Sequence, residues 1–340
     1  MKFFTRFSAA LTVAMVSLSS AAVAQAAEPT VDNPGGVEAI TSPGGVPANG
    51  YGPDRHTFVG AQAVSARTPG LTPLGANDFS CVPAPGTNPV VLVPGTGNDA
   101  YTAWAFFSPR IKQAGYCVYT FNYNPSTNPQ NDAASFMGDI RQSAAFMAGF
   151  VDRVLAATGS KKIDIIGHSQ GGGALPRAYI KWYGGDKKVD KLIGLVPSNT
   201  GTTMMGMNDL IRQLLKWFPT LETEMLNEHN SQALLQQLVG SEFMKDLNSG
   251  ALTYPDITYT VISTVYDTII TPHTRSFLPA GPNVKNMNVQ DICPLDMYGH
   301  PNMPYDSVAL QLSLNALNPS AAQPVQCVKI PKYITANDLA

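Results

Sequence analysis

The chain has 340 residues, enough for one large α/β domain or two small ones, so length alone does not decide the number of domains. Only 14% of its residues are charged, against about 25% in a typical soluble protein, and its formal net charge is −2. Because basic runs are absent too, the composition argues against nucleic acid as a partner and against strong attraction to anionic membranes.

The first 26 residues have the pattern of a secretion signal. Lys2 and Arg6 make the start positive, residues 9–23 are apolar, and small residues precede position 27. A transmembrane anchor is the alternative, but the apolar core is short for a membrane span. We therefore predict a cleaved signal peptide over residues 1–26 and a protein secreted to the extracellular medium or the periplasm.

Residues 27–80 are rich in proline and glycine, and their central part reads NPGGVEAITSPGGVPANGYGP. This composition predicts an extended or poorly ordered stretch that wraps the following domain or links it to the export signal. We therefore separate an N-terminal extension, 27–80, from a single folded domain, 81–340.

From residue 89 onward, short apolar or β-branched runs alternate with helical patterns. The predicted strands cover residues 90–93, 116–121, 162–166, 191–196 and 257–265, with a weaker sixth at 287–292. Predicted helices cover 132–158, which stops at Gly159, and 174–183. Strands that alternate with helices predict an α/β fold with a mostly parallel central sheet flanked by helices.

Residues 204–250 interrupt this alternation. Apolar residues recur at helical spacing within 207–218, 234–239 and 243–247, and Pro219 ends the first of these segments. The helices either pack as an ordinary crossover connection or form a small cap over the carboxyl edge of the sheet. Periodicity indicates a buried face without identifying what covers it, so both interpretations stay open.

The first chemical motif is Gly167-His168-Ser169-Gln170-Gly171, which matches G-x-S-x-G. It follows a predicted strand and opens a predicted helix, the context in which this motif exposes a nucleophilic serine on a sharp turn. The glycines relieve clashes in the turn, and the helix N-terminus favours negative charge beside the serine. Ser169 is therefore the predicted nucleophile, and it needs a base to take its proton.

Three histidines follow Ser169 and are candidates for this base. His229 lies in the interrupting segment, and His273 follows the last clear strand too closely for Asp267 to orient it. His300 lies in a loop between the sixth predicted strand and a final helix, where the last member of such a triad belongs. We therefore predict His300 as the base.

The acid that orients the base should end a strand. Asp267 directly follows the run 257–265, whereas Asp291 lies in or at the end of the sixth predicted strand and Asp296 is very near His300 in sequence. We predict that Asp267 holds the Nδ1 proton of His300 and stabilises the imidazolium.

Acyl transfer also needs fixed donors for the oxyanion. The residue after the nucleophile, Gln170, supplies one backbone N–H, and the loop after an early strand supplies the other. That loop reads PGTGN, with Thr96 between two glycines. It lacks the continuation of a phosphate-binding loop, which argues against a nucleotide, and the chemistry needs no metal or cofactor.

Four cysteines, Cys81, Cys117, Cys293 and Cys327, fit an oxidising compartment. The sequence contains no C-x-x-C pair, the spacing typical of zinc and redox sites. Two structural disulfides are expected, and the sequence by itself allows three pairings.

Five short motifs together resemble a known family. LVPGTG, SQGG, VDKLIGLVPSNTGT, TVYDTIITP and DICPLDMYGH occur in the same order in the secreted α/β-hydrolase lipases related to Candida antarctica lipase B and in related bacterial lipases. The likeness runs from about Cys81 to Cys327, whereas residues 28–79 and 204–250 match poorly. It implies the α/β-hydrolase fold and a catalytic role for the domain 81–340, in which 204–250 is the candidate cap.

The resemblance also implies roles for individual residues. The implied catalytic triad is Ser169, Asp267 and His300. The implied oxyanion donors are the backbone N–H groups of Thr96 and Gln170, with the Thr96 hydroxyl. The implied disulfides are Cys81–Cys117 and Cys293–Cys327.

The resulting prediction is a secreted serine carboxylester hydrolase, a lipase or esterase that forms an acyl-enzyme on Ser169. A hydrolase of polyesters or of another ester class, using the same mechanism, is the alternative. A non-catalytic binding protein with the same fold is a further one. The expected partner is an ester or lipid substrate, met in part at lipid interfaces by a protein that we expect to be a monomer.

Overall fold

The structure is a computed structural model that describes residues 41–42, 44–123, 136–206, 217 and 232–327. The chain divides into two units, Met1–Gly36 and Val37–Ala340, and every described residue belongs to the second. The predicted signal peptide therefore lies outside the described residues. No helix within the described ranges is both long and apolar enough to cross a membrane.

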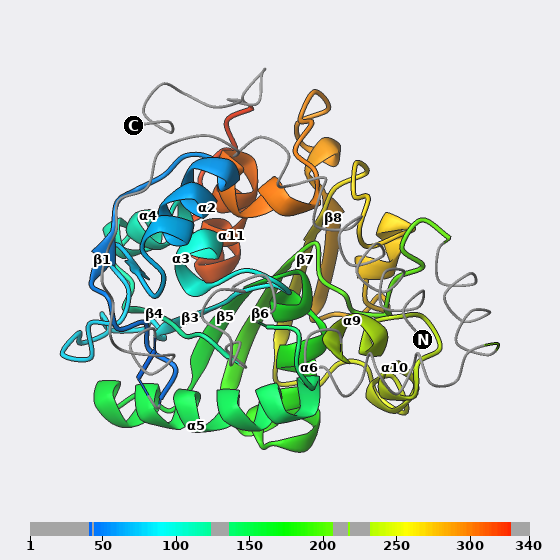
Figure 1. Ribbon diagram of the computed structural model, residues 1–340, viewed down its shortest axis with the longest axis horizontal. Helices are drawn as coiled ribbons and strands as arrows, with labels where there is room; N and C mark the ends of the chain where they lie inside the picture. The colour runs from blue at the N-terminus through cyan, green and yellow to red at the C-terminus, as the bar shows by residue number, and fades with distance from the viewer. Residues whose placement is uncertain (1–40, 43, 124–135, 207–216, 218–231, 328–340) are drawn as a thin grey trace, which may run out of the picture. The chain divides into compact units, whose positions relative to one another are not determined.

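A six-stranded sheet forms the centre of the second unit (Figure 1). Its strand order is β4-β3-β5-β6-β7-β8, and every neighbouring pair is parallel. The strands are β3 (Val90–Val93), β4 (Val118–Thr120), β5 (Ile163–His168), β6 (Val189–Leu195), β7 (Thr258–Ser263) and β8 (Val284–Asn288). Every residue of β3 and β5 is buried, as expected for strands covered on both faces, so the predicted parallel sheet is confirmed.

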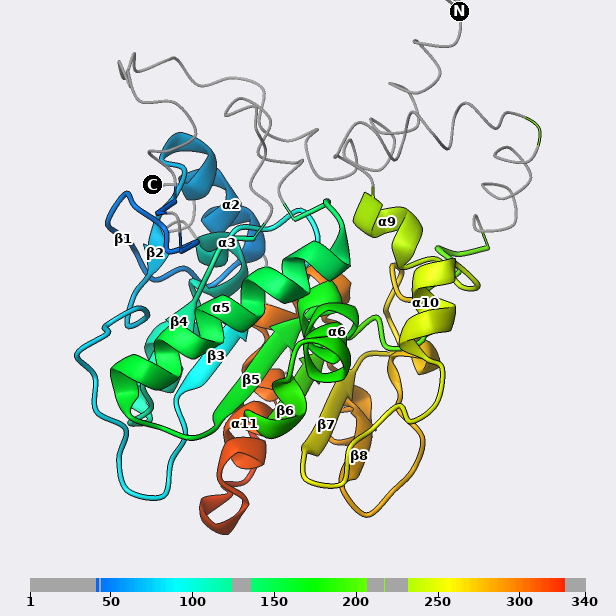
Figure 2. The same ribbon diagram turned by 90° about the horizontal axis from the view of Figure 1, so that it is seen from below.

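Helices cover both faces of this sheet (Figures 1 and 2). One face packs against α5 (Ile140–Thr158), α6 (Ala174–Trp182) and α10 (Glu242–Leu247). The other packs against α2 (Phe58–Arg67), α3 (Ala100–Trp104), α4 (Phe107–Gln113) and α11 (Ser307–Leu317). The 3₁₀ helices are η3 (Ser169–Gly172), η4 (Gly185–Lys187), η5 (His273–Ser276), η6 (Val289–Asp291), η7 (His300–Tyr305) and η8 (Pro319–Ala321).

Two predicted elements differ from the structure in position. The helix expected from residue 132 begins at Ile140, because Phe136 has a φ of 67° and the side chain of Asp139 caps the first turn. The sixth strand is Val284–Asn288 rather than 287–292, because Asn288 and Asp291 cap each other around η6 and so end the strand.

The expectation of an extended or poorly ordered stretch before residue 80 is wrong over 58–67. These residues form α2, whose N-terminus is capped by the Thr57 side chain accepting from the N–H of Gly60. Ala61 is fully buried in the core shared with α3. On either side of α2, β1 (Tyr51–Gly52) and β2 (Thr72–Pro73) form a short parallel ladder.

The segment 204–250 is described only in part. Residues 207–216 and 218–231, which include the first of its three predicted helices, lie outside the described residues. The other two correspond to α9 (Gln232–Gln236) and α10, the latter capped by Ser241 and buried through Phe243, Met244 and Leu247.

Candidate active site

Ser169 lies at the turn from β5 to α6, at the carboxyl edge of the sheet. Its φ of 56° falls in the left-handed region that residues with a side chain rarely adopt. Such strain persists only where the surroundings hold it, and it occurs often at functional sites. This strained strand-to-helix turn is the local geometry that the G-x-S-x-G motif predicts.

Glycines allow this turn to close. A Cβ at Gly167 would overlap the carbonyl oxygen of Gly171, and a Cβ at Gly171 would overlap the carbonyl oxygens of Val93 and Pro94. The obstructing atoms belong to the backbone, so no change of rotamer can make room. The turn therefore requires glycine at both positions that flank the His168-Ser169-Gln170 segment.

His300 connects Ser169 to Asp267. Its Nε2 atom lies 2.9 Å from Oγ of Ser169, and its Nδ1 atom lies 2.9 Å from Oδ2 of Asp267. The other carboxylate oxygen of Asp267 accepts the backbone N–H groups of Ile269 and Ile270, each at 2.8 Å. All three side chains are buried. Because a carboxylate accepts, Nδ1 carries the proton, and Nε2 is free to accept the proton of Ser169.

The alternative acids and bases lie in other surroundings. His273 is in η5, and Asp291 accepts the backbone N–H of Asn288 as part of the cap of η6. Asp296 is buried and accepts the backbone N–H of Tyr298. His229 lies outside the described residues. The structure thus brings together the three residues that the sequence prediction preferred.

Thr96 and Gln170, the two predicted oxyanion donors, meet beside the nucleophile. The Thr96 hydroxyl donates to Oε1 of Gln170 over 3.1 Å. The loop that carries Thr96 passes close to Ser169, since a Cβ placed on Gly95 would lie 3.1 Å from Cβ of Ser169. The loop that carries Thr96 and the side chain of Gln170 are therefore in contact beside Ser169.

His168 contacts the site, and sequence reasoning missed it. Its Nε2 donates to the carbonyl oxygen of His300 over 2.9 Å, across 132 positions of the chain. Burial, with a smaller contribution from the charge of His300, lowers the pKa of His168 to about 3, so the ring is neutral at ordinary pH. It therefore anchors the backbone of His300. Its place next to Ser169 in the motif was the only available signal.

The loop that carries His300 is held at both ends. Cys293 forms a disulfide with Cys327, with the Cα atoms 5.3 Å apart. At the other end, Asp306 caps α11 by accepting the N–H groups of Val308 and Ala309. Burial, together with the negative charge of Asp296, raises the pKa of Asp306 to about 7.

The second disulfide joins Cys81 to Cys117, so both cysteine pairs are those that the family resemblance implied. Within the described ranges, no group of three or more His, Cys, Asp or Glu side chains could hold a metal ion.

Comparisons with known proteins identify relatives of this chain. Residues 87–313 match the profile of the family described as lipase (class 2). Lipase B from Pseudozyma antarctica is 25% identical over 249 residues, which are 71% of this chain and 63% of that protein. The crystal structure of Aspergillus fumigatus lipase B superimposes with a TM-score of 0.54 at 22% identity, over 75% of this chain and 56% of that one.

This chain spans less than two thirds of the length of either lipase B. A more distant likeness is to Bacillus licheniformis lipase BlEst2, with a TM-score of 0.48 and 15% identity over 69% of this chain and 94% of that one. The fold is the α/β-hydrolase fold, and its family match covers most of the chain, including Ser169, Asp267 and His300. The chain belongs to the class 2 lipase family.

Proposed function

We propose that the protein is a secreted serine ester hydrolase, a lipase or carboxylesterase that forms an acyl-enzyme on Ser169. The observation that carries this proposal is the continuous hydrogen-bonded path from Ser169 through His300 to Asp267 on a strained turn. Membership of a lipase family supports an ester as the substrate.

In the proposed reaction, Oγ of Ser169 attacks the ester carbonyl while Nε2 of His300 takes its proton. Asp267 stabilises the imidazolium that results. The backbone N–H groups of Thr96 and Gln170, with the Thr96 hydroxyl, donate to the oxyanion. His300 then protonates the leaving alcohol, and a water molecule that His300 activates releases the acid from the acyl-enzyme.

Exposed apolar side chains on two loops support a lipid substrate. Tyr266 and Ile269 flank Asp267, and Leu295 and Met297 precede His300; all four side chains are exposed. The two loops are neighbours, because the Thr264 hydroxyl donates to the carbonyl of Tyr298. Apolar groups gathered near a site at an exposed edge are typical of contact with an apolar surface, so we include transient contact with lipid interfaces in the proposal.

The two disulfides support export to an oxidising compartment. We propose residues 81–340, with α2 packed in the same core, as the catalytic domain, which works as a monomer without metal or cofactor after removal of the signal peptide 1–26.

The decisive test is Ser169→Ala. We expect the variant to be secreted and folded but to lose ester hydrolysis by a factor on the order of 10⁶ in turnover, as in other serine hydrolases. A fluorophosphonate probe should label the wild-type protein and not the variant. Retention of more than a few per cent of activity would exclude Ser169 as the nucleophile. A wild-type protein that the probe does not label would instead indicate a non-catalytic member of the fold.

Rates on soluble esters, emulsified triacylglycerols and polyester films would then separate an esterase, a lipase and a polyester hydrolase. These enzymes share the mechanism, so the Ser169 test does not distinguish them.

A further inference from the structure

One side chain after α9 reaches the proposed oxyanion site. Gln237 directly follows the helix and is buried. Its Nε2 atom lies 3.1 Å from the hydroxyl of Thr96, 3.0 Å from Oε1 of Gln170 and 2.9 Å from the carbonyl oxygen of Ala233. An amide nitrogen has two protons, so one serves Ala233 and the other is shared between Thr96 and Gln170.

The orientation of the Gln170 amide is fixed from its other side. Its Nε2 donates to the hydroxyl of Tyr123 over 3.0 Å and to the carbonyl oxygen of Phe136 over 3.3 Å. The Tyr123 hydroxyl accepts here because its own proton goes to the carbonyl of Pro94. Burial raises the pKa of Tyr123, which keeps this hydroxyl protonated. Oε1 of Gln170 must therefore face Thr96.

The Thr96 hydroxyl has a single proton and two uses for it. In the resting protein it donates to Oε1 of Gln170. If it is to stabilise an oxyanion, the same proton must turn away from Gln170, which would leave a buried amide oxygen without that donor. An unsatisfied buried acceptor is costly, so the turn is favourable only if another donor stays on Oε1. Gln237 is placed to be that donor.

We infer that Gln237 is a positioning residue of the oxyanion site. The N–H of Gln237 donates to the oxygen of Thr96, so the Thr96 proton points away from Gln237. When that proton turns to the oxyanion, the N–H of Gln237 continues to donate to Oε1 of Gln170. The inference rests on the proposed function, because it assigns a role within the ester hydrolysis.

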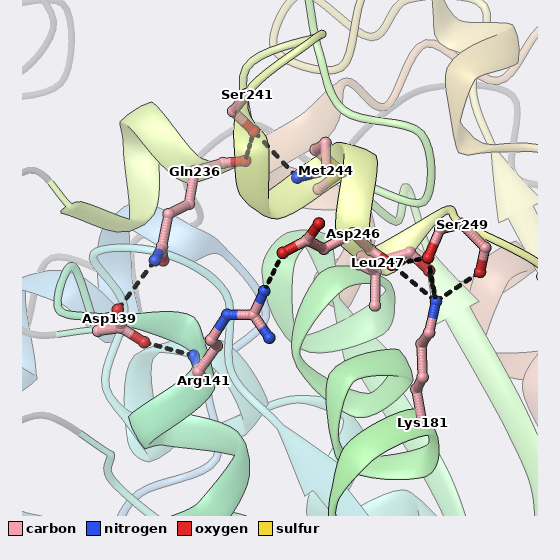
Figure 3. A network of polar contacts seen from close by, with 9 residues as sticks. All are labelled: Asp139, Arg141, Lys181, Gln236, Ser241, Met244, Asp246, Leu247 and Ser249. Carbon is pink, nitrogen blue, oxygen red and sulfur yellow. Dashed lines mark hydrogen bonds and ion pairs between the residues drawn. The ribbon is translucent and has the colours of Figure 1, made fainter.

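The neighbouring residue, Gln236, has partners away from the oxyanion site (Figure 3). Gln236 accepts the backbone N–H of Ile140 over 2.8 Å and donates to Asp139 over 3.0 Å, so it attaches the helix to the start of α5. Ser241 donates to the carbonyl of Gln236 and caps α10. Two consecutive glutamines thus serve different partners, and Gln236 provides a matched control that disturbs the same segment without touching Thr96.

The test is a double-mutant cycle on a soluble short-chain ester. Gln237→Met keeps the length of the side chain and removes the donor. Removing a direct oxyanion donor typically lowers kcat by about 10²–10³, so we expect a smaller loss of roughly 10-fold for a residue that acts through Thr96, with KM nearly unchanged. In a Thr96→Val background, which lacks the hydroxyl, Gln237→Met should change kcat by less than about two-fold.

Gln236→Met is the control, and we expect it to lower the melting temperature while leaving kcat within about two-fold of the wild type. Gln237→Glu keeps the shape but places an acceptor beside the developing charge, so its kcat should fall below that of Gln237→Met. The inhibition constant of an alkyl boronic acid, which forms a tetrahedral adduct on Ser169, should rise in parallel with each loss of kcat.

Two results would overturn the inference. One is an equal effect of Gln237→Met and Gln236→Met on kcat. The other is a Gln237→Met loss that is undiminished in the Thr96→Val background, since that would indicate general packing. Failure of the proposed function looks different, because the wild-type protein itself would then neither hydrolyse esters nor react with the fluorophosphonate probe.

Discussion

At the scale of single residues, His300 joins the proposed nucleophile to the proposed acid through its two ring nitrogens. Because a nucleophile and its base act as one unit, His300→Ala should cost about as much turnover as Ser169→Ala. His273→Ala and His229→Ala should keep most of the activity. Initial rates on one soluble ester would show this, and an inactive His273→Ala with an active His300→Ala would reverse the assignment of the base.

A second residue-scale feature is the buried carboxyl group of Asp306. Burial raises its pKa to about 7 and the charge of Asp296 contributes, whereas an Asp in the unfolded chain has a pKa of about 3.9. Between those two pH values the folded protein binds more protons than the unfolded chain. The free energy of unfolding that this group contributes therefore falls as the pH rises from about 4 to 7.

Asp306→Asn tests this dependence, because asparagine still caps a helix but does not ionise. We expect the melting temperature of the variant, relative to that of the wild type, to rise between pH 5 and pH 8. Thermal unfolding at constant ionic strength measures the difference. Asp291→Asn, which changes an exposed cap of η6, serves as the control. A difference that does not vary with pH would show that Asp306 keeps its ordinary ionisation in the folded protein.

At the scale of elements, the turn between β5 and α6 depends on the absence of side chains. A Cβ at Gly167 would overlap the backbone of Gly171, so Gly167→Ala forces the turn to move. Overpacking of this kind costs about 1–3 kcal/mol, and we expect a loss at the upper end because backbone cannot change rotamer. Activity should fall with it, since Ser169 sits on the same turn.

Gly149 in α5 is the matched control for this prediction. Nothing lies within 4 Å of a Cβ added there, so Gly149→Ala should stabilise the helix by about 0.5–1 kcal/mol. Urea unfolding of both variants provides the comparison, and a Gly167→Ala protein of wild-type stability would show that the turn has room to relax.

At the scale of the whole molecule, the disulfide Cys293–Cys327 encloses η7 and α11 in one covalent loop, with a sequence separation of 34. Closing a loop of this length stabilises a protein by roughly 3–4 kcal/mol in the chain-entropy model. We expect Cys293→Ser with Cys327→Ser to lower the melting temperature and to inactivate faster on heating, while the fluorophosphonate probe still labels Ser169 in the cold.

The other disulfide, Cys81–Cys117, has a similar sequence separation of 36 but does not enclose His300. Removing it should lower the melting temperature with less effect on activity below that temperature. Equal activity losses in the two double variants would indicate that the C-terminal bridge has no particular role at His300.

Several features of the fold and site could be predicted because their causes are local. The strand β3 is a continuous apolar run and β5 contains three isoleucines, and a sheet covered on both faces buries such strands completely. Ser169 was recognised because its motif, its strand and its helix are contiguous in sequence. The order of Asp267 and His300 along the chain, and their places after strands, predict their roles. The cysteine pairing came from the family resemblance, since composition alone allowed three pairings.

At two places, α2 and the start of α5, the sequence pattern predicts a different secondary structure from the one observed. Prolines and glycines dominate the residues around α2, so composition predicts no helix there, although residues 58–67 contain no proline and one glycine. Apolar spacing that continues through Phe136 predicts an earlier start for α5, whereas the positive φ at Phe136 and the cap by Asp139 make the helix begin at Ile140.

The sequence by itself determined the parallel sheet, the turn at Ser169 and the order along the chain of the proposed nucleophile, acid and base. Only the tertiary structure decided which side chains hold them, because those contacts join distant parts of the chain. His168 reaches the carbonyl of His300 across 132 positions, and Gln237 reaches Thr96 across 141. Propensity and periodicity act over a few turns or strands, whereas a hydrogen bond depends on where folding places its two atoms, whatever their separation along the chain.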